Sequence, residues 1–111
     1  FALEAAETLA KEGVEVEVVD LRSLLPLDTE TIFASVKKTH RVLVAHEDKV
    51  FGGFGGEVAA QVSEACFPWL DAPVGRVGST FTPVGFNRIL ERAVLPSTPK
   101  VLEAARRVLA F

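Results

Sequence analysis

The hydrophobic positions of this chain follow helical and strand spacing in turn. Between Leu3 and Ala10, apolar residues recur every three or four positions, which predicts an amphipathic helix ending at Gly13. Residues 14–18 then alternate valine with glutamate, the period of two that predicts a strand with one solvated face. A helix followed by a strand is therefore expected at the start of the chain.

The same two spacings continue through the rest of the sequence. Asp28 follows a chain-breaking proline and can cap a helix running to about Lys38. Residues 42–45 are apolar on both faces, which predicts a central strand covered on both sides. The remaining predicted elements are a helix with the stripe Val58, Val62, Ala65 and Cys66, a short strand over 73–77, a helical turn over 87–93, and a last helix starting at Ser97 whose inward residues are Val101, Leu102, Ala105, Val108 and Leu109.

This alternation of helices and strands defines an α/β fold class. We expect a three-layer sandwich in which a mostly parallel sheet carries helices on both faces. At 111 residues the chain fits one domain, spanning 1–111, with enough residues for a buried core.

Composition and charge exclude several classes of function. The chain is 49% hydrophobic and 24% charged, as in globular proteins. No apolar run approaches the ~20 residues that span a bilayer, so no membrane partner is expected. Residues 1–70 carry 6 basic and 12 acidic groups, and residues 71–111 carry 6 basic and 3 acidic ones. The basic excess of residues 71–111 is too small for a nucleic-acid surface. The single Cys66 excludes an internal disulfide framework and fits a cytoplasmic location.

The glycines of the segment GGFGG, at residues 52–56, invite comparison with phosphate-binding loops. The third glycine of the dinucleotide pattern would stand at position 58, which is Val58, and no lysine-containing phosphate loop follows. The segment is interpreted as a tight strand-to-helix turn. Its end at a helix N-terminus would still favour a nearby anion.

Residues with reactive side chains do not form a recognisable catalytic set. His46 and Glu47 are neighbours on a strand and point to opposite faces, and no second metal ligand lies at the right spacing. Ser63 and Ser79 lack a partnered base. His46 is expected in a core or an interface, and Cys66 is expected in the core. We predict no catalytic, cofactor-binding or metal residues in this chain.

Two further features have alternative interpretations. Asp20 and Arg22 stand two apart at a predicted strand end, which favours an ion pair over ligand contact. Trp69 lies in a loop, where packing and interface roles are equally compatible with the sequence.

The terminal Phe111 combines an apolar ring with a carboxylate and suits a partner's basic pocket.

Five segments resemble the C-terminal, transketolase-type domain of the β subunit, or fused α–β chain, of thiamine-dependent 2-oxo acid dehydrogenases. They are VEVVDLRSLLPLDTETI (16–32), SVKKTHRVLVAHED (35–48), GGFGGEVAAQVSE (52–64), LDAPVGRV (70–77) and LPSTPKVLEAARRVL (95–109). The resemblance covers nearly the whole chain in the family's order. The His46–Glu47 pair and Cys66–Phe67 look closest to the branched-chain, 2-oxoisovalerate type.

The resemblance implies an assembly role within a larger enzyme. In the family, thiamine diphosphate and magnesium bind elsewhere, between the α subunit and the preceding domain of the β subunit. The domain contacts a second β subunit and docks the subunit-binding domain of the lipoyl acyltransferase core. In this chain Asp71 and Phe111 are the docking candidates, and the subunit-interface candidates are His46, Glu47, Phe51 and Phe54.

The family domain opens with a strand before its first helix, so we expect that strand to be missing here and the chain to be a piece of a longer one. Three alternatives stay open. The substrate could be pyruvate or acetoin, the enzyme could be a transketolase or deoxyxylulose-phosphate synthase, or the chain could be a free-standing anion- or nucleotide-binding module.

Overall fold

Two parallel strands lie at the centre of the fold. The computed structural model describes all residues from Phe1 to Phe111. Strand β1 (Leu43–Lys49) pairs with β2 (Gly75–Ser79), with Leu43 opposite Gly75 and Ala45 opposite Val77, before the register shifts. The elements are α1 (Ala2–Lys11), α2 (Thr29–Thr39), β1 (Leu43–Lys49), α3 (Phe54–Cys66), the short 3₁₀ turn Phe67–Trp69, β2 (Gly75–Ser79), α4 (Arg88–Val94) and α5 (Thr98–Leu109).

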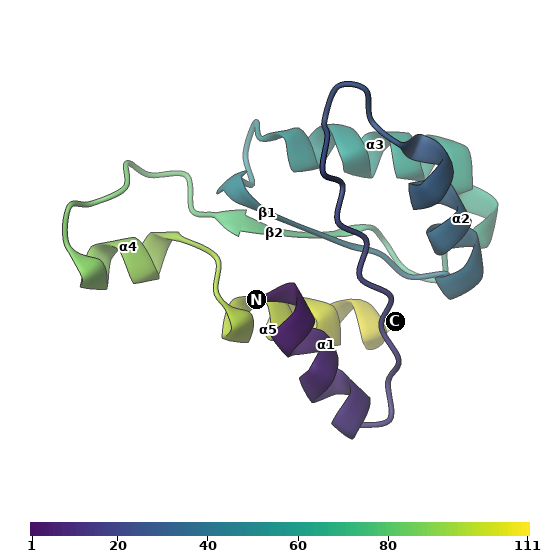
Figure 1. Cartoon of the computed structure of the whole chain (residues 1–111), viewed down its shortest axis with the longest axis horizontal. Coiled ribbons are helices and arrows are strands. Elements are labelled where there is room, and N and C mark those ends of the chain that lie inside the picture. The colour runs from purple at the N-terminus through teal and green to yellow at the C-terminus, as the bar shows by residue number, and fades with distance from the viewer.

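The helices cover both faces of this sheet (Figure 1). One buried cluster joins α2 and α3 to the sheet and is centred on Ile32, Val36, Val62 and Cys66. On the other face, α1 and α5 pack through Ala5, Val77, Val101 and Ala104. The three-layer α/β architecture predicted from the sequence is therefore confirmed. Helix α4 and the loop before it project from the rest of the molecule (Figure 1).

Local chemistry accounts for the ends of several helices. The Asp28 carboxylate accepts a bond of 3.0 Å from the Thr31 amide, which confirms it as the N-cap of α2. Gly13 follows α1 with a φ of 84°, the left-handed conformation that glycine adopts without steric cost. The Asn87 side chain caps α4 by accepting from two backbone amides.

Residues 14–18 do not form the predicted strand. The segment from 15 to 20 makes no backbone–backbone hydrogen bond; it runs across the molecule without a ladder partner (Figure 1). The valine–glutamate alternation favours extended backbone, but a strand also needs a neighbouring edge to pair with. The prediction of a paired strand was wrong for that reason.

Other element predictions need smaller corrections. Strand β1 is an edge strand rather than the predicted central one, because β2 is its single partner. Helices lie on both faces of the sheet, but Ala45 remains exposed. Strand β2 begins at Gly75 rather than at Pro73, which has no N–H to donate to a ladder. Helix α3 begins at Phe54, before Val58, which is the first residue of its predicted apolar stripe. On α5, Leu109 is exposed and Ala104 is buried instead.

Candidate functional site

The predicted docking residue Asp71 lies in a shallow groove beside α3. Its backbone amide donates to the His40 carbonyl at 2.9 Å, which fixes the start of the segment leading to β2. The carboxylate is 59% exposed and stands 3.9 Å from Nη1 of Arg41. The residues lining the groove are Gly56, Ala59, Ala60, Ser63, Phe67, Leu70, Asp71, Ala72, Pro73, Val74 and Arg76. An exposed acid and the exposed ring of Phe67 thus share one hollow of the surface.

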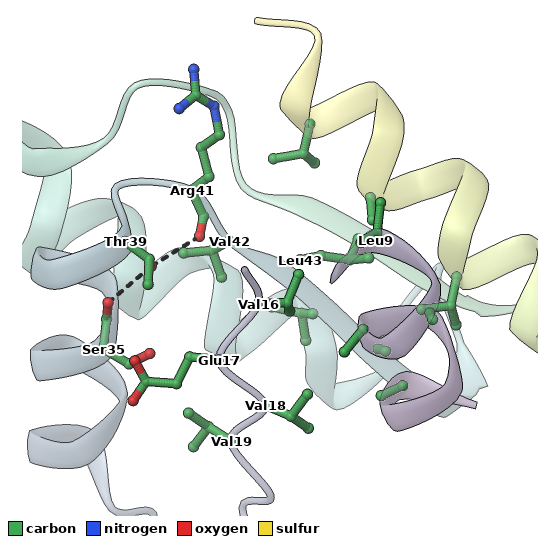
Figure 2. A pocket seen from close by; sticks show the side chains of 18 of the residues that line it. Leu9, Val16, Glu17, Val18, Val19, Ser35, Thr39, Arg41, Val42 and Leu43 are labelled. Carbon is green, nitrogen blue, oxygen red and sulfur yellow. Dashed lines mark hydrogen bonds between the residues drawn. The ribbon is translucent and has the colours of Figure 1, made fainter. Parts of the chain in front are cut away.

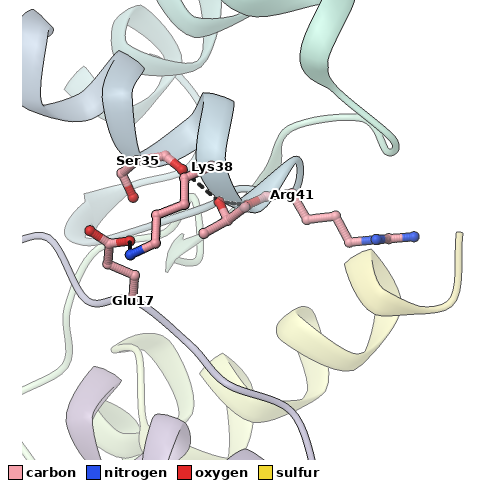
Figure 3. A network of polar contacts seen from close by, with 5 residues as sticks. Glu17, Ser35, Lys38 and Arg41 are labelled. Carbon is pink, nitrogen blue, oxygen red and sulfur yellow. Dashed lines mark hydrogen bonds and ion pairs between the residues drawn. The ribbon is translucent and has the colours of Figure 1, made fainter.

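Arg41 is the residue at this site that sequence reasoning missed. Its side chain points toward the carboxyl end of α5, away from the nearby ion pair in which Lys38 contacts Glu17 at 3.0 Å (Figure 3). The Arg41 Nε is buried and has no hydrogen-bond partner. No motif marks this position, since its partner Asp71 lies far along the chain. Arg41 reduces the negative charge that Asp71 presents.

The neighbouring Trp69 is held by two contacts. Its carbonyl oxygen lies 2.7 Å from Nδ1 of His40, and the Lys37 ammonium lies 4.4 Å from the ring centroid, a cation–π contact. The ring remains 38% exposed. Packing within the chain explains the position of Trp69, and part of its surface remains open.

The second predicted docking residue, Phe111, follows the end of α5. Its side chain is 72% exposed, and the chain shows no ion pair to its terminal carboxylate. No hydrogen bond or ion pair joins Phe111 to Asp71, whose carboxylate is paired with Arg41. Both candidates are accessible, but they are not joined into one contact network.

The predicted interface residue His46 is packed inside its own chain. A Cβ built on Gly55 would stand 2.2 Å from the His46 Nε2, and one on Gly78 would stand 3.2 Å from its Cε1. Both ring nitrogens are buried and without hydrogen-bond partners. The ring therefore packs against the glycine turn at Gly53 and Gly55, where a Cβ would stand 3.0 Å or less from the imidazole.

The other predicted interface residues are more exposed. Glu47 extends its side chain to solvent, while its carbonyl accepts from the buried Ser79 hydroxyl. Phe51 is 72% exposed, and its ring meets that of Phe81 edge-on, with centroids 4.8 Å apart. Phe54 is 36% exposed. Their assignment to a subunit interface stays a prediction.

The reactive side chains have structural partners. The Ser63 hydroxyl donates to the Ala59 carbonyl at 2.7 Å, the Cys66 side chain is fully buried, and Arg22 pairs with Asp20 at 2.9 Å. The predictions of a core cysteine and of an Asp20–Arg22 pair are confirmed. No group of three His, Cys, Asp or Glu side chains is placed to hold a metal ion.

Shifted pKa values arise from surface contacts between elements. The Thr98 hydroxyl, followed by the charge of the chain's amino group, lowers the pKa of Glu4. Hydrogen bonds from the Thr31 hydroxyl and amide lower the pKa of Asp28. The Glu12 carboxylate raises the pKa of Arg106. These contacts cap α2 and tie α1 to α5.

None of the helices is long and apolar enough to cross a membrane.

A parallel sheet with helices on both faces defines the class of this chain as an α/β domain. The sequence profile described as "Transketolase, C-terminal domain" matches residues 1–101. The chain belongs to this family.

Two relatives and one solved structure show which proteins this chain resembles. The chain is 42% identical over 108 residues to "Pyruvate dehydrogenase E1 component subunit beta" of Rickettsia felis, covering 97% of this chain and 33% of that protein. It is 45% identical to the mitochondrial pyruvate dehydrogenase β subunit of Pisum sativum, covering 96% and 30%. The solved structure "Split gene transketolase, inactive beta4 tetramer" aligns with a TM-score of 0.83 and 34% identity, covering 98% of this chain and 35% of that one. The chain thus spans about a third of the length of these proteins.

Proposed function

We propose that this chain is the C-terminal assembly domain of the β component of a thiamine-dependent 2-oxo acid dehydrogenase. The observation that carries the proposal is the match to pyruvate dehydrogenase β subunits over 97% of the chain. The packing of His46, Ser63 and Cys66 into structural roles supports assembly rather than catalysis within this domain. Thiamine diphosphate and magnesium would act elsewhere in the complete enzyme, beside an α subunit or α-type domain.

Pyruvate is the substrate that the relatives favour. The sequence motifs around His46 and Cys66 pointed to branched-chain acids, but the names of the relatives support the pyruvate alternative. The test is turnover of the complete enzyme with pyruvate, 2-oxoisovalerate and acetoin at equal concentration. We expect the highest kcat/KM with pyruvate, and a clear preference for 2-oxoisovalerate would restore the branched-chain assignment. The cytoplasmic location remains a prediction, and the Pisum sativum relative is named as mitochondrial.

Asp71 and Phe111 are proposed to bind basic groups of the acyltransferase core's subunit-binding domain. Charge-assisted bonds of this kind are strong when they are shielded from solvent. Binding of the complete enzyme to that domain should weaken with Asp71→Ala and with deletion of Phe111. Asp71→Asn is the matched variant, since it keeps the shape and removes the charge. Unchanged affinity of all three variants at low and moderate salt would refute the docking role.

A second candidate is the C-terminal part of a transketolase. The similarity to the split-gene transketolase favours it, at 34% identity. That transketolase was solved as an inactive tetramer of β chains, which supports an oligomer-forming role for this chain under either candidate. Ketol transfer between sugar phosphates by the complete enzyme would favour the transketolase, and oxidative decarboxylation of a 2-oxo acid would exclude it.

A further inference from the structure

Residues 80–94 form an arm that projects from the rest of the molecule (Figure 1). The arm is closed at its base, where the Thr80 amide donates to the Val94 carbonyl at 3.0 Å and the Val94 side chain is buried. The Lys100 ammonium donates to three backbone carbonyls at and just after the end of α4. The two ends of the arm are therefore held together, as in a compact surface loop.

The tip of the arm presents apolar side chains to solvent. Phe86 is fully exposed, and Ile89 is 77% exposed. A Cβ built on Gly85 would stand 2.6 Å from the Leu90 Cβ, so the loop before α4 packs closely on the helix. The Asn87 side chain caps the same helix. The tip therefore has a fixed shape before any partner binds, and an exposed apolar surface of this kind marks an interaction site.

The groove beside α3 has a shape that complements the arm. Its volume is about 820 Å³, which is enough for several side chains. Because large side chains pack best against small ones, the bulky tip of an arm suits a floor of small residues. Phe86 is fully exposed, so the arm does not enter the groove of its own molecule. The small residues on α3 are Gly56, Ala59, Ala60 and Ser63, and the other lining residues include Leu70, Pro73 and Val74.

The charges beside the tip and beside the groove are opposite in sign. Arg88 and Arg92 are exposed and lie one turn apart on α4. Glu57 and Glu64 are exposed on α3, one turn on either side of Ala60. No ion pair within the chain uses any of these four side chains. They are therefore free to pair across a contact between two molecules, where opposite charges orient the partners.

Another hollow of the molecule suits the arm less well. It opens between Val16, Val18 and Leu43 (Figure 2) and has a volume of about 350 Å³. Its Glu17 carboxylate already pairs with the Lys38 ammonium at 3.0 Å. This hollow therefore offers the arm less space, and its Glu17 is already neutralised.

We propose that the arm of one copy of this chain docks in the α3 groove of a second copy. Phe86 and Ile89 fill the hollow over Ala60, and the two arginines of α4 face the two glutamates of α3. The contact leaves Asp71, which follows the carboxyl end of α3, free for another partner. None of the interface residues implied by the family resemblance belongs to the arm or lines the groove. The proposal does not rest on the proposed function.

Disulfide cross-linking in the complete protein that contains this chain tests the contact. Two forms with different tags are co-expressed, one with Ile89→Cys and the other with Ala60→Cys. The matched control replaces Ala60→Cys by Ala10→Cys, at an exposed alanine of α1. Because a disulfide forms only when the two Cα atoms come within about 7 Å, we expect at least ~10-fold more linked pairs with Ala60→Cys than with the control. Equal yields would overturn the proposal.

Charge reversal provides a second measurement on the same cross-link. Arg92→Glu in the Ile89→Cys form should lower the yield by at least ~3-fold, and Glu64→Arg in the Ala60→Cys form should restore it. Both positions are exposed, so neither change should disturb folding. Recovery in the doubly reversed pair supports docking of the arm on α3. A loss without recovery would show that the arm contacts a different surface and would contradict the proposal.

Discussion

The imidazole of His46 fills the space that a side chain at Gly55 would need. A Cβ at Gly55 would lie 2.2 Å from Nε2 and 2.3 Å from Cδ2 of the ring, well inside van der Waals contact. Gly55 is buried in the first turn of α3, directly after the glycine turn. The start of α3 at Gly55 and the ring of His46 on β1 therefore pack directly against each other.

Replacing Gly55 should therefore destabilise the domain. Gly55→Ala is expected to cost about 1–3 kcal/mol, the usual range for overpacking a filled site. Chemical unfolding monitored by circular dichroism measures the change. The double variant Gly55→Ala/His46→Ala should lose less unfolding free energy than the two single variants lose together. The shorter side chain at position 46 removes the clash with the added Cβ.

Gly56 provides the matched control for this prediction. A Cβ there meets its nearest neighbour, Arg76 Nη1, at 3.4 Å, and the position is also helical. Gly56→Ala should be neutral or slightly stabilising, since alanine loses less backbone entropy than glycine in a helix. Equal losses for Gly55→Ala and Gly56→Ala would contradict the packing role of His46.

The cap of α2 predicts a pH-dependent contribution to stability. Bonds from Thr31 lower the pKa of Asp28 in the folded chain. A carboxyl with a lowered folded pKa stabilises the fold above its unfolded pKa, and this is lost as the pH falls through the folded value. Asp28→Ala, which removes both the charge and the hydrogen-bond acceptor, should lower the melting temperature by a few degrees at pH 6 and less at pH 2. Glu30→Gln, in the same turn but outside the cap, should show a smaller difference, and equal behaviour of both variants would refute the cap.

Cys66 should report global unfolding. Its side chain is fully buried between α2 and α3, and it is the single cysteine of the chain. Modification by an aromatic disulfide reagent should be at least ~100-fold slower in the folded chain than in denaturant, because the thiol must first be exposed. Fast modification without denaturant would show that the packing of α3 on α2 is loose.

Arg41 should oppose docking at Asp71. Its guanidinium lies 3.9 Å from the carboxylate and competes with a basic partner for the same charge. In the complete enzyme, Arg41→Gln should therefore strengthen binding of the subunit-binding domain by roughly 2- to 5-fold, in keeping with the small energies of exposed ion pairs. Lys38→Gln removes the same charge from a residue paired with Glu17 and should have a smaller effect. Weaker binding with Arg41→Gln would contradict the competition.

The features that sequence predicted well depend on nearby residues. The Asp28 cap acts on an amide three positions away, and the burial of Cys66 follows from helical spacing within α3. The layered fold followed from the order of such local elements. The docking candidates Asp71 and Phe111 came from a family resemblance, and the structure adds that both are exposed.

The features that sequence missed depend on distant partners. The valines of segment 14–18 carry a strand pattern, but residues 15–20 form no backbone hydrogen bond with a strand edge. The contact between Arg41 and Asp71 joins two loops with no shared motif. His46 could be expected in a core or an interface, and only the fold shows that the turn at Gly55 covers it.

The most direct test of the proposed function is the reaction of the complete enzyme that contains this chain. Purified with thiamine diphosphate and magnesium, it should consume pyruvate and acylate a lipoyl domain, with release of carbon dioxide. It should not transfer a ketol group from xylulose 5-phosphate to ribose 5-phosphate. Lipoyl acylation from pyruvate would support a 2-oxo acid dehydrogenase component. Ketol transfer without lipoyl acylation would contradict that assignment and place the chain in a transketolase.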